Sequence, residues 1–165
     1  MIHYPHVGSV EDALRLNKSQ KRKIAGMDDI EALPVSAARY LPHRPPMAMI
    51  ERILAVGQKS VASMTVRATC PFLGTDGVLH PSAISEIAAQ AAAAVDSFRF
   101  EGAERPGFLV SVRNVVSLAE MRVGDEILVS FRQEDTMPQW FRIDFELNSP
   151  SGKEFAKGEI DVCLL

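Results

Sequence analysis

The clearest pattern of apolar and polar positions lies in the middle of the chain. Residues Ser82 to Phe100 contain no internal glycine or proline, and Pro81 suits the first position of a helix. Apolar side chains recur there at helical spacing and mark one face: Ile84, Ile87, Ala91, Val95 and Phe98. Because alanines cover most of the opposite side, the pattern predicts a helix that is buried nearly all round.

The segments on either side of this helix carry strand patterns. Two runs rich in branched residues, 47–57 and 60–69, precede it, with a bend at 57–59. Four more strands are expected after it, over 107–117, 125–135, 139–149 and 153–165. Helix and strands do not alternate, so the pattern predicts an α+β fold. Its antiparallel sheet, with the last four strands in a meander, is expected to curl around the buried helix.

The N-terminal part of the chain is less regular. Residues 1–26 are polar and basic at their centre, and they predict a mobile arm ahead of a folded domain over 27–165. A short helical pattern over 28–39 is broken by Pro34, and three prolines within 40–46 then impose a stiff, extended turn. One helix cannot fill both ends of a concave sheet, so pairing with a second copy is expected.

Composition and charge narrow the possible functions. The chain has 165 residues, a net charge of −3 and a pI near 5.8, which gives no reason to expect nucleic acid or an anionic membrane as a partner. Cys70 and Cys163 are too few for a disulfide framework or a zinc site, and His3 and His6 lack metal-binding spacing. With no secretory signal and no transmembrane-length run, a cytoplasmic protein without cofactor or metal is predicted.

Two motifs resemble a known family. The run from Leu41 to Met47, LPHRPPM, followed by Ile50 to Leu54, IERIL, is similar to the N-terminal signature of hotdog-fold 3-hydroxyacyl-acyl carrier protein dehydratases. A second set resembles a divergent branch of that family, found in aryl-polyene and fatty-acid-like biosynthesis: Pro71, Phe72, Leu73, Asp76, Gly77, Leu79, Glu86, Ala89 and Gln90. The resemblance implies a central helix wrapped by a curved antiparallel sheet, and dimers with active sites at the subunit interface. It also implies a thioester substrate on acyl carrier protein or coenzyme A.

The resemblance assigns roles to a few residues. Dehydration needs a base for the α-proton, an acid for the departing hydroxyl and a donor for the thioester oxygen. The family's helix carboxylate corresponds to Glu86, and its companion glutamine to Gln90. Its catalytic histidine position holds Phe72, which transfers no protons.

The family's backbone N–H donor falls on Pro81, which has no N–H. A shift of one residue would place the N–H of Ser82 there. His80, just before the helix, is the candidate replacement for the missing histidine.

Each assignment has a structural alternative. Glu86 could form an ion pair with Arg44 or Arg113, His80 could cap the helix, and His43 with Arg44 could fix the proline-rich turn. Three functions follow: a 3-hydroxyacyl-acyl carrier protein dehydratase, a non-catalytic subunit of a complete dehydratase, or a thioesterase that uses Glu86. The subunit interpretation is favoured by Phe72 and Pro81. The dimer could form with itself or with another hotdog chain.

Overall fold

The computed structural model describes residues 33–100 and 106–165. Its elements, in chain order, are β1 (Val35–Ser36), a 3-10 turn η1 (Ala37–Arg39), β2 (Arg52–Ala55), β3 (Ser60–Thr65), α2 (Ala83–Arg99), β4 (Gly107–Ser117), β5 (Glu126–Met137), β6 (Trp140–Asn148) and β7 (Glu154–Leu164). The helix is the one that the apolar pattern predicts, to within a residue at each end. The predicted arm over 1–26 lies outside the described residues, so the division of the chain at residue 27 stays a prediction.

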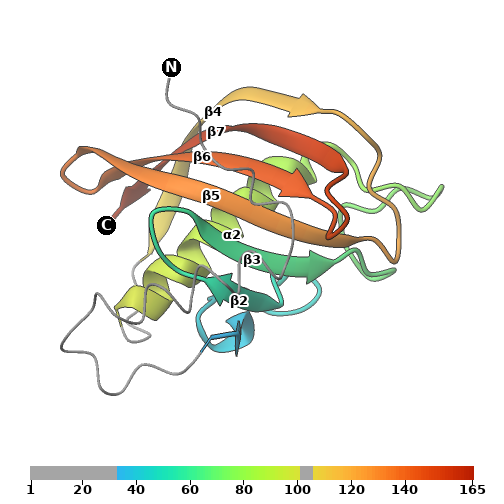
Figure 1. Ribbon diagram of the computed structural model, residues 1–165, viewed down its shortest axis with the longest axis horizontal. Helices are drawn as coiled ribbons and strands as arrows, with labels where there is room; N and C mark the ends of the chain where they lie inside the picture. Colours follow the sequence, from blue (N-terminus) through green and yellow to red (C-terminus); the bar gives the residue numbers. More distant parts are fainter. Residues whose placement is uncertain (1–32, 101–105) are drawn as a thin grey trace.

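All the strands belong to one seven-stranded antiparallel sheet, in the order β1-β2-β3-β5-β6-β7-β4. Helix α2 lies against one face of this sheet, and the strands curve around it (Figure 1). This arrangement confirms the α+β hotdog architecture, with a long buried helix inside a curved antiparallel sheet.

The prediction of a four-stranded meander is wrong for one strand. Strands β5, β6 and β7 follow one another as expected, but β4 pairs with β7 at the far edge. In a meander β4 would pair with β5. Instead β3 pairs with that edge of β5, through six residue pairs. Two other local patterns also differ: β2 begins only at Arg52, and residues 35–39 form a short strand and a 3-10 turn.

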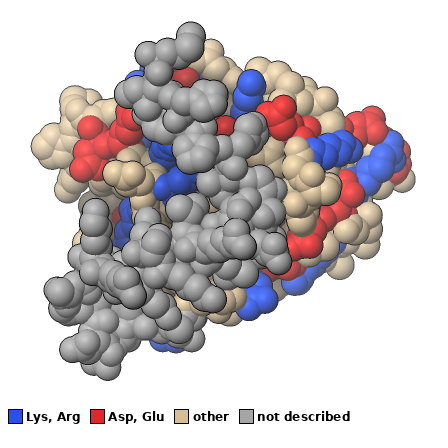
Figure 2. Space-filling model, viewed as in Figure 1, with Lys and Arg blue, Asp and Glu red and all other residues tan. Residues whose placement is uncertain are grey.

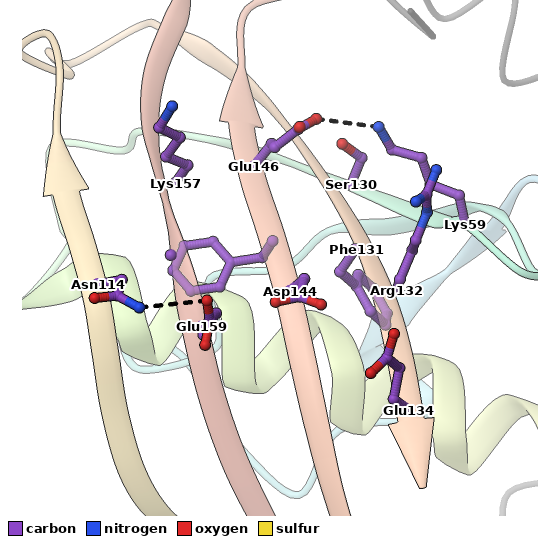
Figure 3. A pocket seen from close by; sticks show the side chains of 12 residues that line it. Lys59, Asn114, Ser130, Phe131, Arg132, Glu134, Asp144, Glu146, Lys157 and Glu159 are labelled. Atoms are coloured by element: carbon purple, nitrogen blue, oxygen red, sulfur yellow. Dashed lines mark hydrogen bonds and ion pairs between the residues drawn. The ribbon is translucent and has the colours of Figure 1, made fainter. Parts of the chain in front are cut away.

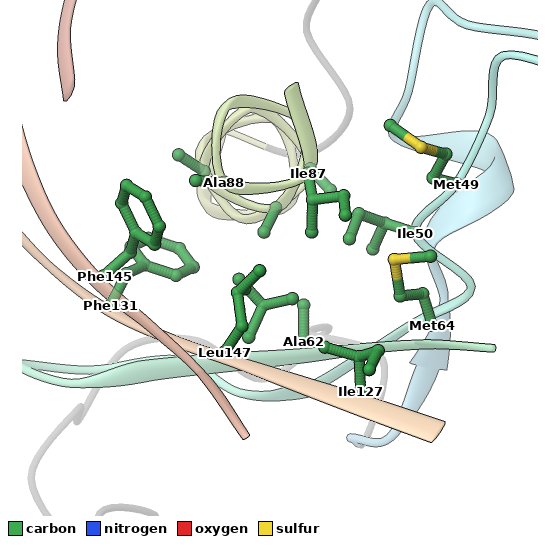
Figure 4. Packing of buried hydrophobic residues seen from close by; sticks show 14 of the residues in the cluster. Met49, Ile50, Ala62, Met64, Ile87, Ala88, Ile127, Phe131, Phe145 and Leu147 are labelled. Atoms are coloured by element: carbon green, nitrogen blue, oxygen red, sulfur yellow. The ribbon is translucent and has the colours of Figure 1, made fainter. Parts of the chain in front are cut away.

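The core lies between α2 and the inner face of the sheet. Ile87 and Ala88 of the helix pack toward Ala62, Leu147 and the rings of Phe131 and Phe145 (Figure 4). Five of the buried helix residues are alanines, and alanine allows the sheet to come close to the helix backbone. The alanine-rich composition therefore explains how a short sheet can curve tightly around one helix.

Strand β4 is fastened to its neighbours on the outer face of the sheet. Asp161 of β7 accepts hydrogen bonds from Ser111 Oγ (2.7 Å) and Arg142 Nε (3.1 Å), and it pairs with Arg113. The hydrogen bond from Ser111 is the main cause that lowers the pKa of Asp161, and both arginines act in the same direction. A Cβ at Gly158 would come within 2.6 Å of Val115 Cγ2, so β4 and β7 can approach this closely only because residue 158 is glycine.

Candidate active site

Gln90 is the anchor of the site. Its side chain is buried in α2, where its Oε1 accepts a hydrogen bond from the N–H of Met49 (2.9 Å). Its Nε2 donates to the carbonyl of Met47 (2.8 Å) and to Oε1 of Glu86 (2.8 Å). The amide thus satisfies two backbone groups of the segment before β2 without a neighbouring strand.

Glu86 lies one turn before Gln90, in the first turn of α2. The partial positive charge at a helix N-terminus favours a carboxylate there. Its side chain is 28% exposed, so the carboxylate is only partly covered by the chain. Oε1 is held by Gln90, whereas Oε2 has no hydrogen-bond partner among the described residues. One oxygen is therefore fixed and the other is available to a substrate.

His43 is the residue that the sequence interpretation did not place in the site. Its Nε2 lies 3.5 Å from Glu86 Oε1, and its side chain is 33% exposed. Its Nδ1 is buried and has no hydrogen-bond partner among the described residues. The LPHRPPM motif contained this histidine, but its sequence distance from Glu86 gave no sign that the two meet.

The structure places His80 at the entrance of the helix. This side chain is exposed, and its Nδ1 lies 2.8 Å from Ser82 Oγ and accepts the backbone N–H of Ser82 at 3.2 Å. That geometry is the capping arrangement given above as the alternative. The ring of His80, a candidate base, and the N–H of Ser82, a candidate donor to the thioester oxygen, are therefore bonded to each other. The catalytic role of His80 stays a prediction that this local pairing does not favour.

Phe72 and the two arginines have structural contacts. Phe72 packs partly buried against the core, and its carbonyl accepts the N–H of His80 at 2.8 Å. Arg44 Nη1 donates to the carbonyls of Leu41 (2.9 Å) and His43 (3.1 Å), so it fixes the proline-rich turn. Arg113 pairs with Asp161. The ion pairs of Glu86 with Arg44 or Arg113 are therefore wrong, and His43 takes their place.

A hollow lies away from Glu86, on the outer face of the sheet. It has a volume of about 500 Å³ and is lined mainly by charged side chains of both signs, among them Lys59, Arg132, Asp144 and Glu159 (Figure 3). Burial is the main cause that raises the pKa of Asp144, and the carboxylates of Glu159 and Glu134 add to it. Glu86 and His43 do not line this hollow, so it is separate from the candidate active site. On the part of the face that Figure 2 shows in colour, acidic and basic side chains lie interspersed.

In residues 33–100 and 106–165, no group of three or more His, Cys, Asp or Glu side chains could hold a metal ion. Within the same ranges, no helix is both long and apolar enough to cross a membrane.

Comparison with known proteins identifies relatives of this arrangement. A family model described as ApeP dehydratase matches residues 35–163. Among solved structures, "The Dehydratase Heterocomplex ApeI:P from Xenorhabdus doucetiae" is similar, with a TM-score of 0.71 and 21% identity over 79% of this chain and 91% of that one.

Two further structures have the same fold. One is a Streptococcus mutans protein bound to acetyl CoA, with a TM-score of 0.58 and 13% identity over 76% of this chain and 96% of that one. The other is zebra fish thioesterase superfamily member 2, with a TM-score of 0.57 and 16% identity over 95% and 98%. None of the curated proteins compared with the chain matches it significantly.

Proposed function

The chain belongs to the family of ApeP-like dehydratases, and we propose that it removes water from a 3-hydroxyacyl chain held as a thioester on acyl carrier protein. The observation that carries the proposal is the partly covered carboxylate of Glu86 on α2, with Oε1 fixed by Gln90 and His43. A positioned carboxylate with one free oxygen can move a proton between two atoms of one substrate. Biosynthesis of a fatty acid or polyene is the pathway class in which this reaction is needed.

In this mechanism Glu86 is the acid and base. Its Oε2 takes the proton from C2 of the substrate, and the electron pair of the broken C–H bond is delocalised onto the thioester oxygen. The protonated carboxyl then gives this proton to the 3-hydroxyl, and the C3–O bond breaks as the C2=C3 double bond forms. Water leaves, the carboxylate is restored and the product is an unsaturated thioester. One general acid–base residue of this kind contributes roughly 10²- to 10⁴-fold to the rate.

His43 acts as a positioning residue for Glu86. Its Nε2 lies 3.5 Å from Glu86 Oε1, and its Nδ1 is buried without a hydrogen-bond partner among the described residues. His43 then holds the carboxylate in place and does not exchange protons with the substrate.

A second subunit is part of the proposal. The helix start offers no evident donor for the thioester oxygen, because Pro81 has no N–H and the N–H of Ser82 is bonded to His80. The similar structure from Xenorhabdus doucetiae is described as a dehydratase heterocomplex. We therefore assign the missing donor to a non-identical hotdog subunit that pairs with this chain.

One experiment tests the function. The purified chain, alone and together with a hotdog partner, is incubated with a 3-hydroxyacyl-acyl carrier protein, and the products are followed by mass spectrometry. Loss of one water, abolished in Glu86→Gln and kept in Glu154→Gln, supports dehydration by this chain. Glu154 is a suitable control because it is an exposed carboxylate at the start of β7.

The second candidate function is a non-catalytic subunit, which Phe72 and Pro81 favour. In that case the chain changes the rate or the chain-length preference of its partner, and Glu86→Gln has no effect on dehydration. Release of a free acid would instead show thioester hydrolysis.

A further inference from the structure

Charge is distributed unevenly along the chain. Residues 33–70 carry five arginine or lysine side chains and a single carboxylate, that of Glu51, whereas residues 71–165 carry eight basic and fifteen acidic side chains. Lys59 pairs with a carboxylate of β6. The other four basic residues of the first range are exposed arginines, which we call the arginine surface: Arg39, Arg44, Arg52 and Arg67. The segments that precede α2 are therefore cationic, in a chain whose larger C-terminal part is acidic.

Three of these arginines are brought together around Glu51. The carbonyl of Glu51 accepts the N–H of Ala37 at 2.8 Å, which fixes the 3-10 turn that ends at Arg39. The carboxylate of Glu51 pairs with Arg67 Nη2 at 2.8 Å and accepts a hydrogen bond from its Nε at 2.9 Å. Arg52 follows Glu51 directly and begins β2. The three guanidinium groups thus come from segments that one residue joins.

The arginine surface extends to the candidate active site. A small hollow of about 30 Å³ is lined by both Arg67 and Pro45, so the end of β3 lies against the proline-rich turn. Arg44 precedes Pro45 in that turn, and His43 precedes Arg44. Because His43 Nε2 lies 3.5 Å from Glu86 Oε1, a molecule that binds the arginines is beside the carboxylate proposed to react.

Much of this positive charge is not neutralised within the described residues. Arg52 has no hydrogen-bond or ion-pair partner there, and Arg44 donates to backbone carbonyls, which carry no net charge. Arg67 is paired, but only with the one carboxylate of this range. Arginine stays charged at any physiological pH and is enriched where proteins bind each other. The surface is therefore suited to a partner with negative charge.

The position and spread of the arginines select the kind of partner. A thioester that reaches Glu86 is held either by coenzyme A or by a carrier protein. The four arginines stand on separate segments: the 3-10 turn η1, the proline-rich turn, β2 and the residues after β3. Such a spread matches the acidic surface of a folded protein better than the phosphate groups of one nucleotide. Complementary charge of this kind accelerates encounter and fixes the orientation of a partner.

We propose that the arginine surface binds acidic side chains of the acyl carrier protein, and that it makes the protein prefer this carrier over coenzyme A. Binding beside the proline-rich turn brings the thioester to Oε2 of Glu86. This inference rests on the proposed function for the identity of the carrier. It adds the surface that selects the carrier.

Association and turnover together test this surface. Association of the protein, with its hotdog partner, is measured by fluorescence anisotropy on a labelled 3-hydroxyacyl-acyl carrier protein at low and high salt. The value of kcat/KM is measured on the same acyl group held by the carrier protein, by coenzyme A and by a short pantetheine thioester. Arg52→Glu is expected to weaken association roughly tenfold at low salt and less at high salt, because exposed charges are screened. Its rate on the short thioester should not change, which also shows that the variant folds.

Two further variants sharpen the test. Lys153→Glu is the matched control, since Lys153 is an exposed cation in the turn before β7, and association should stay within about twofold. Glu51→Gln acts in the opposite direction. It removes the carboxylate that pairs with Arg67, so the carrier protein should bind more tightly.

The outcomes separate this inference from the proposed function. Association that is unchanged in Arg52→Glu, or that weakens as much in Lys153→Glu, overturns the surface. An equal loss of kcat/KM on all three substrates overturns its role in binding the carrier. Dehydration that is as efficient on coenzyme A as on the carrier protein supports the reaction and overturns the preference. Salt-dependent association that Arg52→Glu weakens, without any dehydration, supports the surface and contradicts the proposed reaction.

Discussion

Two segments approach the N-terminal half of α2, and each brings a histidine. The segment over 41–49 is fastened to the helix through Gln90, and its histidine, His43, reaches Glu86. The segment over 70–82 leads directly into the helix, but its histidine, His80, is engaged by Ser82. The histidine nearest to Glu86 in the sequence is therefore not the one that contacts it.

The two segments differ in how their backbone hydrogen-bonding groups are satisfied. A segment that enters a helix must cap free backbone N–H groups, and His80 does so with its own ring. The other segment has its turn fixed by Arg44 and its backbone bonded by Gln90, which leaves the ring of His43 free to contact a carboxylate. If this distinction carries over to activity and stability, changes at Glu86, Gln90, His43 and His80 should have effects of decreasing size.

The largest effect is expected from Glu86→Gln. The amide keeps an oxygen that accepts from Gln90 but cannot take the α-proton, so kcat should fall roughly 10²- to 10⁴-fold. Steady-state kinetics of the assembled protein on a 3-hydroxyacyl-acyl carrier protein measure this. Full activity in this variant would remove Glu86, and with it the whole comparison, from the mechanism.

Gln90→Met should mainly affect stability. The thioether fills similar space but leaves the carbonyl of Met47 and the N–H of Met49 unsatisfied, which costs roughly 2–4 kcal/mol in the free energy of unfolding. Urea unfolding measures the change. Gln58→Met, on an exposed residue, is the control and should stay within about 0.5 kcal/mol. Equal stabilities would mean that the segment over 41–49 is held by other contacts.

His43→Ala should lower kcat roughly 10- to 100-fold. The variant loses the 3.5 Å contact between His43 Nε2 and Glu86 Oε1, so the carboxylate is held by Gln90 alone. A tenfold change in rate corresponds to about 1.4 kcal/mol of transition-state stabilisation. His43→Gln, which keeps an N–H donor, should recover part of the activity, as expected of a positioning residue. A His43→Gln variant no better than His43→Ala would instead indicate that the ring itself transfers protons.

The smallest effect is expected from His80→Ala. Loss of the contact with Ser82 removes a cap and should cost at most about 1 kcal/mol in stability. The kcat should stay within about twofold, because no described contact joins His80 to Glu86. A loss as large as that of His43→Ala would reverse the comparison and support His80 as the catalytic base.

Much of the fold could be predicted from local sequence. The helix over Ala83–Arg99 and most of the strands follow from periodicity, and the motifs gave the family, which the match over 35–163 confirms. The contact between Glu86 and Gln90 could also be predicted, because residues four apart lie on one helix face. The pairing partner of each strand could not be predicted from local sequence. For that reason the place of β4 next to β7 was missed.

The sequence alone determined which segments are helical or extended, because side-chain periodicity records whether a face is buried. It also determined that a carboxylate and an amide stand together on an otherwise apolar helix. Only the tertiary structure decided which histidine meets that carboxylate and which strand lies at the far edge of the sheet. Both depend on contacts between residues far apart in the chain, where the approach of backbones and the satisfaction of buried polar groups select the partner.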